Sequence, residues 1–240
     1  MTLASTIIDE IEVDLSDSDN DKWAESEHLV NLNEAERQLV AFLPTAYTVT
    51  KVYQLAEGTR QSLPDGTASY QDPSSNTLPQ AIEMVKITRN MGTTGLVDGT
   101  AITVVEKAVL DEFLPSWHTA TASATVEHYT FDQQDRTEFF VYPPQPSSSM
   151  GWVESVYSAV PTALTATSDS INLHDTYIDP IKHFMKFKAY AKDAKISEFA
   201  AARASAEWNL FLTLIGRKDL IERQYVPRVS DGNIINSVQR

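Results

Sequence analysis

Three aspartates at alternate positions, Asp17, Asp19 and Asp21, come closest to a known chemical motif. They match the first three ligand positions of the calcium-binding EF-hand loop, which then needs glycine at its sixth position and glutamate at its twelfth. Those two positions hold Lys22 and His28. The motif is therefore incomplete, and we predict a solvated acidic loop with no bound metal.

The other residue types that catalyse reactions show no catalytic arrangement. The histidines lie far apart, at positions 28, 118, 128, 174 and 183, and none forms H-E-x-x-H or a close pair suited to zinc. We expect His118 and His174 to hold turns by hydrogen bonds. No serine lies in G-x-S-x-G, no glycine-rich segment has phosphate-loop spacing, and the chain has no cysteine. These patterns predict that the protein is not an enzyme and holds no cofactor.

An aromatic ribbon is the remaining candidate for a binding site. In EHYTFDQQDRTEFFVYPPQP (127–146), two alternating stretches flank a polar turn, which predicts a β-hairpin. Rings of this kind stack on sugars or bases. They are Tyr129, Phe131, Phe139, Phe140 and Tyr142. Alternation places about half of them in a core, and the others would strengthen cross-strand pairs or an intermolecular contact. We favour core or interface, with a carbohydrate-gripping hairpin as the alternative.

Composition limits the possible partners. The 240 residues are 42% hydrophobic and 22% charged, as in ordinary soluble globular proteins. A net charge of −14 argues against a general nucleic-acid binder. Residues 181–240 carry 11 basic and 6 acidic side chains, whereas residues 1–180 carry 8 and 27. This asymmetry suits a molecule with different partners at its two ends, or it reflects chance variation between solvated faces. No apolar run reaches 18 residues and the N-terminus is acidic, so we expect no membrane segment and no signal peptide.

Helical periodicity marks both ends of the chain. Leu3, Ile7, Ile8 and Ile11 predict a helix over 3–14. A second helix, within SEHLVNLNEAERQLVAFLP (26–44), would be capped by Ser26 or Asp21 and end at Pro44. Near the C-terminus, Asp179 and Pro180 would begin one helix and Ser197 would cap another. The apolar stripe of this last helix is predicted at Phe199, Ala202, Ala206, Leu210, Leu214 and Ile221.

Period-two alternation marks the middle of the chain. YTVTKVYQL (47–55) and RQSLP (60–64) flank AEGT and predict a hairpin. Further strands are predicted in AIEMVKITRNM (81–91) and WVESVYSAVP (152–161), with GTTGLVDGT as a turn. Short strands interrupted by turns and prolines favour an antiparallel sandwich or barrel.

Together these elements predict an α+β protein. Helices in 1–46 and 175–224 pack as one bundle. An antiparallel β domain over 47–165, with a short helix near 106–114, is inserted between them, and residues 225–240 form an extended tail.

Seven segments resemble the head-to-tail adaptor proteins of short-tailed bacteriophages, the family that includes tail tubular protein A. They are WAESEHLVNLNEAERQLVAFLPTA (23–46), EGTRQSLP (57–64), ITRNMG (87–92), LPSWH (114–118), FFVYPPQP (139–146), VESVYSAVP (153–161) and YAKDAK (190–195). They span most of residues 1–220. The DSDND loop (17–21) and the tail after residue 224 depart from the pattern.

The resemblance implies a structural ring subunit of the virion neck, assembled in the host cytoplasm. Twelve copies would lie between the portal protein and the tail nozzle, with the helical part on the portal and neighbouring copies and the β part on the nozzle. Genomic DNA would pass through without sequence-specific binding, because an acidic lining repels phosphates. We also expect the free protein to be a monomer that forms a ring only on its portal.

The tail is the predicted contact site for the portal or a neighbouring copy. It is rich in isolated apolar residues, and NIINSV (233–238) is typical of a segment that adds a strand to a partner's sheet or lies in a groove. A frayed terminus is the alternative. The predicted contact residues are Tyr225, Val226, Arg228, Val229, Ile234, Ile235, Val238 and Arg240.

Overall fold

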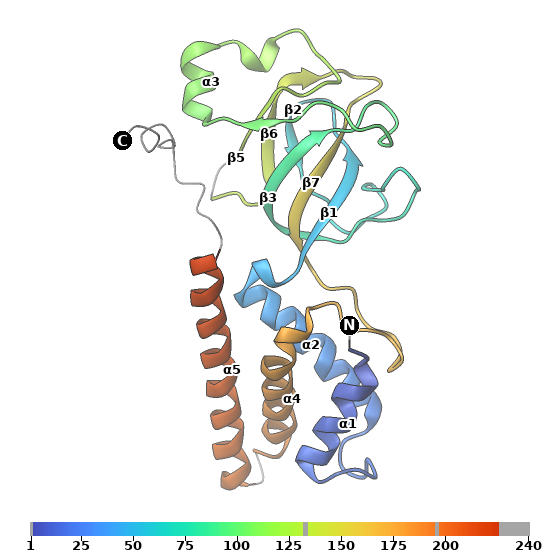
Figure 1. Cartoon of the computed structure of the whole chain (residues 1–240), viewed down its shortest axis with the longest axis vertical. Helices are drawn as coiled ribbons and strands as arrows, with labels where there is room; N and C mark the ends of the chain where they lie inside the picture. Colours follow the sequence, from blue (N-terminus) through green and yellow to red (C-terminus); the bar gives the residue numbers. More distant parts are fainter. Residues whose placement is uncertain (1, 132–133, 195–196, 226–240) are drawn as a thin grey trace, which may run out of the picture. The chain divides into compact units, whose positions relative to one another are not determined.

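The computed structural model describes residues 2–131, 134–194 and 197–225, with the backbone alone over 217–225. The predicted α+β class is confirmed, with helices toward both ends of the chain and strands between them (Figure 1). The chain divides into two compact units. We call Met1–Ser5 with Glu36–Asp175 the β unit, and Thr6–Ala35 with Thr176–Arg240 the helical unit.

The helical unit contains most of α1, the first part of α2, and all of α4 and α5. These helices are α1 (Ala4–Leu15), α2 (Glu25–Phe42), α4 (Ile178–Asp193) and α5 (Glu198–Tyr225). Ile7, Ile8 and Ile11 are at most 1% exposed, so the predicted core face of α1 is confirmed, whereas Leu3 is exposed. Because α4 and α5 are apolar on facing sides, they pack along each other, with Phe184 and Phe211 in contact at a ring-centroid distance of 5.3 Å.

Two of the predicted helix starts are wrong. Helix α2 begins at Glu25, so neither Ser26 nor Asp21 is its N-cap, and the Glu27 amide donates to the Ala24 carbonyl. Helix α4 begins at Ile178, two residues before Pro180, and Tyr177 precedes it without a side-chain cap. The cap on α5 is confirmed, because the Ala200 amide donates to Ser197 Oγ at 3.4 Å. Proline and Asp tolerate several positions in a first turn, so their presence fixes a helix start only to within a few residues.

The predicted core face of α5 is also wrong. Phe199 and Leu210 are 66% and 46% exposed, and Ala202 and Ala206 are exposed as well. The buried residues are Ala200, Ala204, Phe211 and Ile215, and three of these directly follow a predicted residue. One residue turns a helix by about 100°, so this shift moves the core face by more than a quarter turn. Leu214 is half-buried, and the Ile221 side chain lies outside the described residues. The helix carries apolar residues on two faces, and periodicity alone selected the solvent-facing one.

The β unit contains two sheets, in the orders β1-β7-β3 and β2-β6-β5-β4. All pairs are antiparallel except β4 with β5. The strands are β1 (Thr48–Gln54), β2 (Gly58–Ser62), β3 (Ala81–Asn90), β4 (Thr103–Val104), β5 (His128–Phe131), β6 (Glu138–Gln145) and β7 (Trp152–Ala159). Buried residues of both sheets form one hydrophobic cluster, which includes Tyr53, Phe139 and Tyr157.

The predicted hairpin between β1 and β2 does not form. Strand β1 pairs with β7 and β2 pairs with β6, so the chain passes from one sheet to the other at residues 55–57. The Gln61 side chain holds this crossing: its amide donates to the Ala56 and Gly58 carbonyls at 2.8 and 3.0 Å, and its oxygen accepts from the Ala56 amide at 2.7 Å. Side-chain bonds thus replace the backbone pairing that a hairpin would have supplied.

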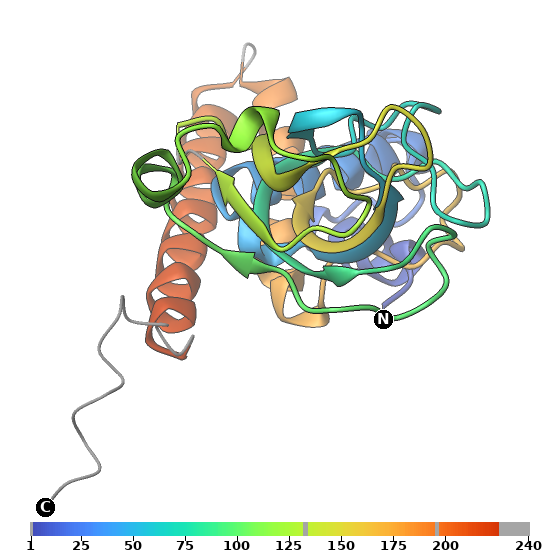
Figure 2. The same ribbon diagram turned by 90° about the horizontal axis from the view of Figure 1, so that it is seen from above.

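The aromatic hairpin is confirmed as β5 paired with β6. Phe139 and Tyr129 are 0% and 4% exposed, whereas Phe131, Phe140 and Tyr142 are half-buried. The predicted strands in 81–91 and 152–161 are confirmed as β3 and β7, and the predicted short helix as α3 (Lys107–Phe113). Figure 2, which looks at the β unit from above, shows α3 projecting from one side of the strands.

Candidate interaction surfaces

The acidic loop between α1 and α2 differs from the prediction at its first residue. The Asp17 carboxylate is buried and accepts the amides of Lys22 and Trp23, the latter at 2.9 Å, so it closes the turn that leads into α2. Asp19 and Asp21 are exposed, as expected. Among the described residues no cluster of histidine and carboxylate side chains is suited to a metal.

Two histidines have contrasting environments. His118 Nδ1 lies 2.8 Å from Thr59 Oγ1 of β2, and its ring stacks on Trp117 with a centroid distance of 3.6 Å. This hydrogen bond joins two distant segments, and the predicted role of His118 in holding a turn stays a prediction. His28 is fully buried in the helical unit, and neither of its ring nitrogens has a partner among the described residues. Burial lowers the pKa of His28, because the charged imidazolium would lose its hydration. We therefore expect His28 to be neutral at physiological pH.

The lysines of α4 pair with acidic residues of α1 and α2. Lys186 Nζ lies 3.1 Å from Asp14, and Lys192 Nζ lies 2.7 Å from Glu27. The further ion pairs of this set are Lys182–Glu10 and Lys188–Glu34, and Lys22, in the loop before α2, pairs with Asp193 of α4. The helical unit as a whole holds 12 basic and 17 acidic side chains, and the β unit holds 7 and 16. Lysines from the basic C-terminal part of the sequence are therefore paired with carboxylates of the same unit, and both units carry a net negative charge.

The exposed stripe of α5 is one candidate interaction surface. It consists of Phe199, Ala202, Ala206 and Leu210, with Arg203 beside them. The Arg203 guanidinium carbon lies 4.4 Å from the Phe199 ring centroid, a cation–π contact that leaves most of the ring in solvent. Small alanines between two large apolar residues allow another element to approach the helix backbone closely.

A hollow beside α3 is a second candidate surface, in the β unit. The α3 hollow has a volume of about 310 Å³ and is mainly apolar. Its floor is fixed, because Trp117 is 1% exposed, donates from Nε1 to Asp111 at 2.9 Å and packs edge-on against Phe140 of β6. Phe113 at its rim is 74% exposed. The apolar residues around it are Phe113, Leu114, Pro115, Trp117, Ala120 and Tyr142.

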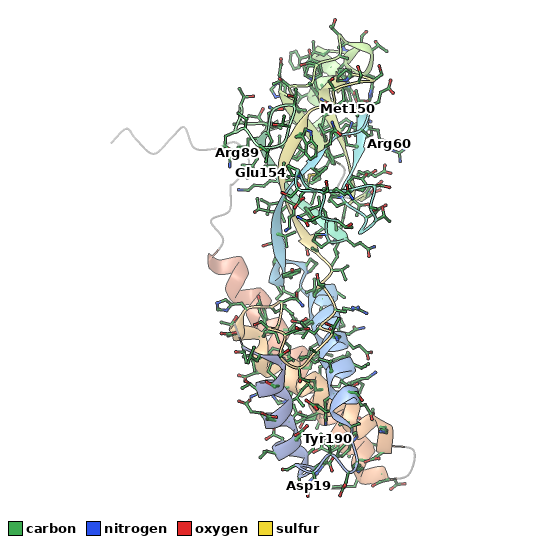
Figure 3. The ribbon with its side chains drawn as sticks, turned by 90° about the vertical axis from the view of Figure 1, so that its right-hand side faces the viewer. Asp19, Arg60, Arg89, Met150, Glu154 and Tyr190 are labelled. Atoms are coloured by element: carbon green, nitrogen blue, oxygen red, sulfur yellow. The ribbon has the colours of Figure 1, made fainter. Side chains whose placement is uncertain are left out.

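The loop between β3 and β4 (residues 91–102) carries a third apolar feature. Leu96 and Val97 are 72% and 64% exposed at its tip. At its base, Arg89 of β3 lies against Glu154 of β7, with two nitrogen–oxygen distances of 3.1 and 3.2 Å (Figure 3). The same guanidinium contacts Asp98 of the loop at 2.8 Å. The sequence predicted a turn here but not its exposed apolar tip.

The aromatic hairpin borders an open hollow of about 600 Å³. Phe131 and Phe140 line it together with charged residues, including the ion pair between Arg60 and Glu138 and the amine of Lys107. The two rings are therefore accessible from one side, as a stacking site would require. The carbohydrate alternative stays a hypothesis.

The residues predicted for the tail contact lie outside the described part of the chain, apart from the backbone of Tyr225, which ends α5. The helix thus includes the first residue of the predicted tail. None of the helices in the described ranges is long and apolar enough to cross a membrane.

Two comparisons with known proteins bear on function. A family model described as SU10 adaptor protein matches residues 1–231. A search of curated proteins finds no significant match.

Proposed function

The chain belongs to the SU10 adaptor protein family, and on this premise we propose that it forms the ring that joins the portal to the tail nozzle in a bacteriophage neck. Membership makes it a phage head-to-tail adaptor, a structural component of the virion neck. The observation that carries the proposal is the extent of the match, which includes both units and all the described elements.

The proposed ring has twelve copies, with the helical unit against the portal and neighbouring copies and the β unit toward the nozzle. Exposed apolar residues support a role in assembly. The α5 stripe and the α3 hollow each present large apolar side chains to solvent, and apolar patches of this kind mark protein contacts. The copies would be assembled in the host cytoplasm.

The channel of the proposed ring is acidic and holds DNA without base contacts. Both units carry more acidic than basic side chains, and the α4 lysines are already paired with carboxylates. Among the side chains that the structure describes in the helical unit, a phosphate backbone therefore meets few unpaired cations, which favours sliding over binding.

The proposed portal contact is the tail, through Tyr225, Val226, Arg228, Val229, Ile234, Ile235, Val238 and Arg240. We expect deletion of residues 226–240 to leave the melting temperature nearly unchanged, because it removes none of the buried apolar residues that the structure describes. The same deletion should severely weaken attachment to the portal. A truncated protein that joins portals with wild-type affinity would remove the tail from the contact.

The test of the function as a whole is electron microscopy of the purified protein mixed with the portal protein of the same phage. We expect a twelve-fold ring on the tail-facing side of the portal, and added nozzle protein should bind its free face. The absence of a complex, or binding to another virion component, would overturn the proposal.

A further inference from the structure

The base of the β3–β4 loop is joined to β7 by backbone hydrogen bonds, and its tip is exposed. The Met91 amide donates to the Trp152 carbonyl at 2.7 Å, and the Trp152 amide donates back to Gly92 at 3.1 Å. Gly95 has φ +75°, and a Cβ there would lie 2.5 Å from Pro73 and 2.7 Å from the Trp152 ring, so only glycine lets the loop pass this close. Leu96 and Val97 therefore project from a pre-organised loop, and little conformational entropy remains to be lost when they bind.

The α3 hollow suits such a tip. Its apolar wall of leucine, proline and aromatic side chains offers no charged group, and about 310 Å³ lies at the lower end of the volumes of binding pockets. This volume accommodates two branched aliphatic side chains. Trp117 and Phe140 fix the floor by packing, so the hollow, like the loop, is formed before any partner arrives.

The loop and the hollow belong to the same unit but lie on opposite sides of it. Both views show α3 on one side of the strands and the loop that follows β3 on the other (Figures 1 and 2). One copy cannot fill its own hollow with its own loop. Two different patches on opposite sides generate a head-to-tail contact, which closes into a ring when the rotation between copies allows it.

We propose that Leu96 and Val97 of one copy insert into the α3 hollow of the next copy. This contact deepens the proposed function, on which it rests, by naming the surfaces through which β units meet around the ring. It is small compared with the roughly 800 Å² per partner of a stable interface, so it is weak for a single pair of free copies. Copies held on a portal gain the high effective concentration that makes such a contact form.

The absence of native cysteine makes disulfide trapping a direct test, because introduced thiols are the only ones present. A Leu96→Cys chain is mixed at high concentration with an Ala120→Cys chain that carries a tag, and the mixture is oxidised with copper phenanthroline. Ala120 lines the hollow, and neither substitution removes a residue of the hydrophobic core. The matched control is Leu210→Cys, an exposed leucine of the helical unit, mixed with the same tagged chain.

We expect the disulfide between positions 96 and 120 to form at least ten times faster than the control disulfide. A chain that carries both substitutions should give covalent oligomers larger than dimers. Adding Val97→Asp to the Leu96→Cys chain should lower the rate of disulfide formation to that of the control, because it places a charge in the apolar hollow. A Leu96–Ala120 rate equal to the control, or a dominant Leu96–Leu96 disulfide, would overturn the proposal. Either result leaves the neck location to be decided by microscopy with the portal. Conversely, trapping without portal binding would retain the contact and overturn the function.

Discussion

Substituting adjacent residues of α5 gives a sharp test of its buried face. Phe211 is 0% exposed, and its ring lies 5.3 Å from both the Phe184 and Trp208 rings, centroid to centroid. Phe211→Ala removes these aromatic contacts and leaves a cavity between α4 and α5. Buried Phe→Ala substitutions cost about 3–5 kcal/mol, and we expect a loss in this range.

Leu210→Ala is the matched control, one position earlier on the same helix. Full burial of a leucine contributes about 1.5–3 kcal/mol, and this side chain is 46% exposed. Alanine is also the better helix former, which offsets part of the lost contact. We therefore expect Leu210→Ala to cost at most about 1 kcal/mol.

Both variants are measured by urea denaturation at neutral pH, followed by far-ultraviolet circular dichroism and by tryptophan fluorescence. Agreement between the two signals would justify a two-state treatment of a chain with two units. A Leu210→Ala loss equal to or larger than the Phe211→Ala loss would refute the assignment of the buried face and would restore the face that periodicity alone selected.

Three further predictions follow from the structure. Glu36 is 1% exposed and accepts the Asn172 and Leu173 amides at 2.7 and 3.3 Å, so Glu36→Ala should cost about 2–5 kcal/mol in urea denaturation. Glu34→Ala, which removes a half-buried partner of Lys188, should cost less than about 1 kcal/mol, and equal losses would contradict this. Burial lowers the pKa of His28 below 6.5, although the charges of Glu27 and Asp17 oppose this shift. The stability that depends on neutral His28 is therefore complete above pH 6.5 and is lost as the pH falls through the folded-state pKa. His28→Leu should reduce the pH dependence of the unfolding free energy in that window, and an unchanged dependence would rule out His28 as its source. In light scattering at micromolar concentration without portal, we expect a monomer, and a stable dodecamer would show that the contacts between copies are stronger than their exposed areas imply.

Local pattern predicted the elements whose signals depend only on the neighbouring residues. The alternation in 127–146 and 152–161 identified β5, β6 and β7, because side chains of a strand point to opposite sides whatever its partner. The isoleucines of α1 identified its core face, because residues three and four positions apart lie on the same side of a helix. The adaptor family was likewise recognisable from short sequence segments before any fold was known.

Tertiary structure decided which strands, helices and side chains of the chain pair with one another. The period of β1 marks it as a strand, but its backbone donors and acceptors are the same for any neighbour, so nothing local indicates that it pairs with β7, a hundred residues away, instead of β2. The Asp17 carboxylate resembles its exposed neighbours in sequence and is distinguished only by the two amides that the folded turn presents to it. The charge asymmetry was visible in the sequence, whereas its pairing required α4 to lie against α1 and α2. On α5, two apolar faces satisfy helical periodicity equally well, and the packing of Phe211 against Phe184 determines which face is buried and which is left for a partner.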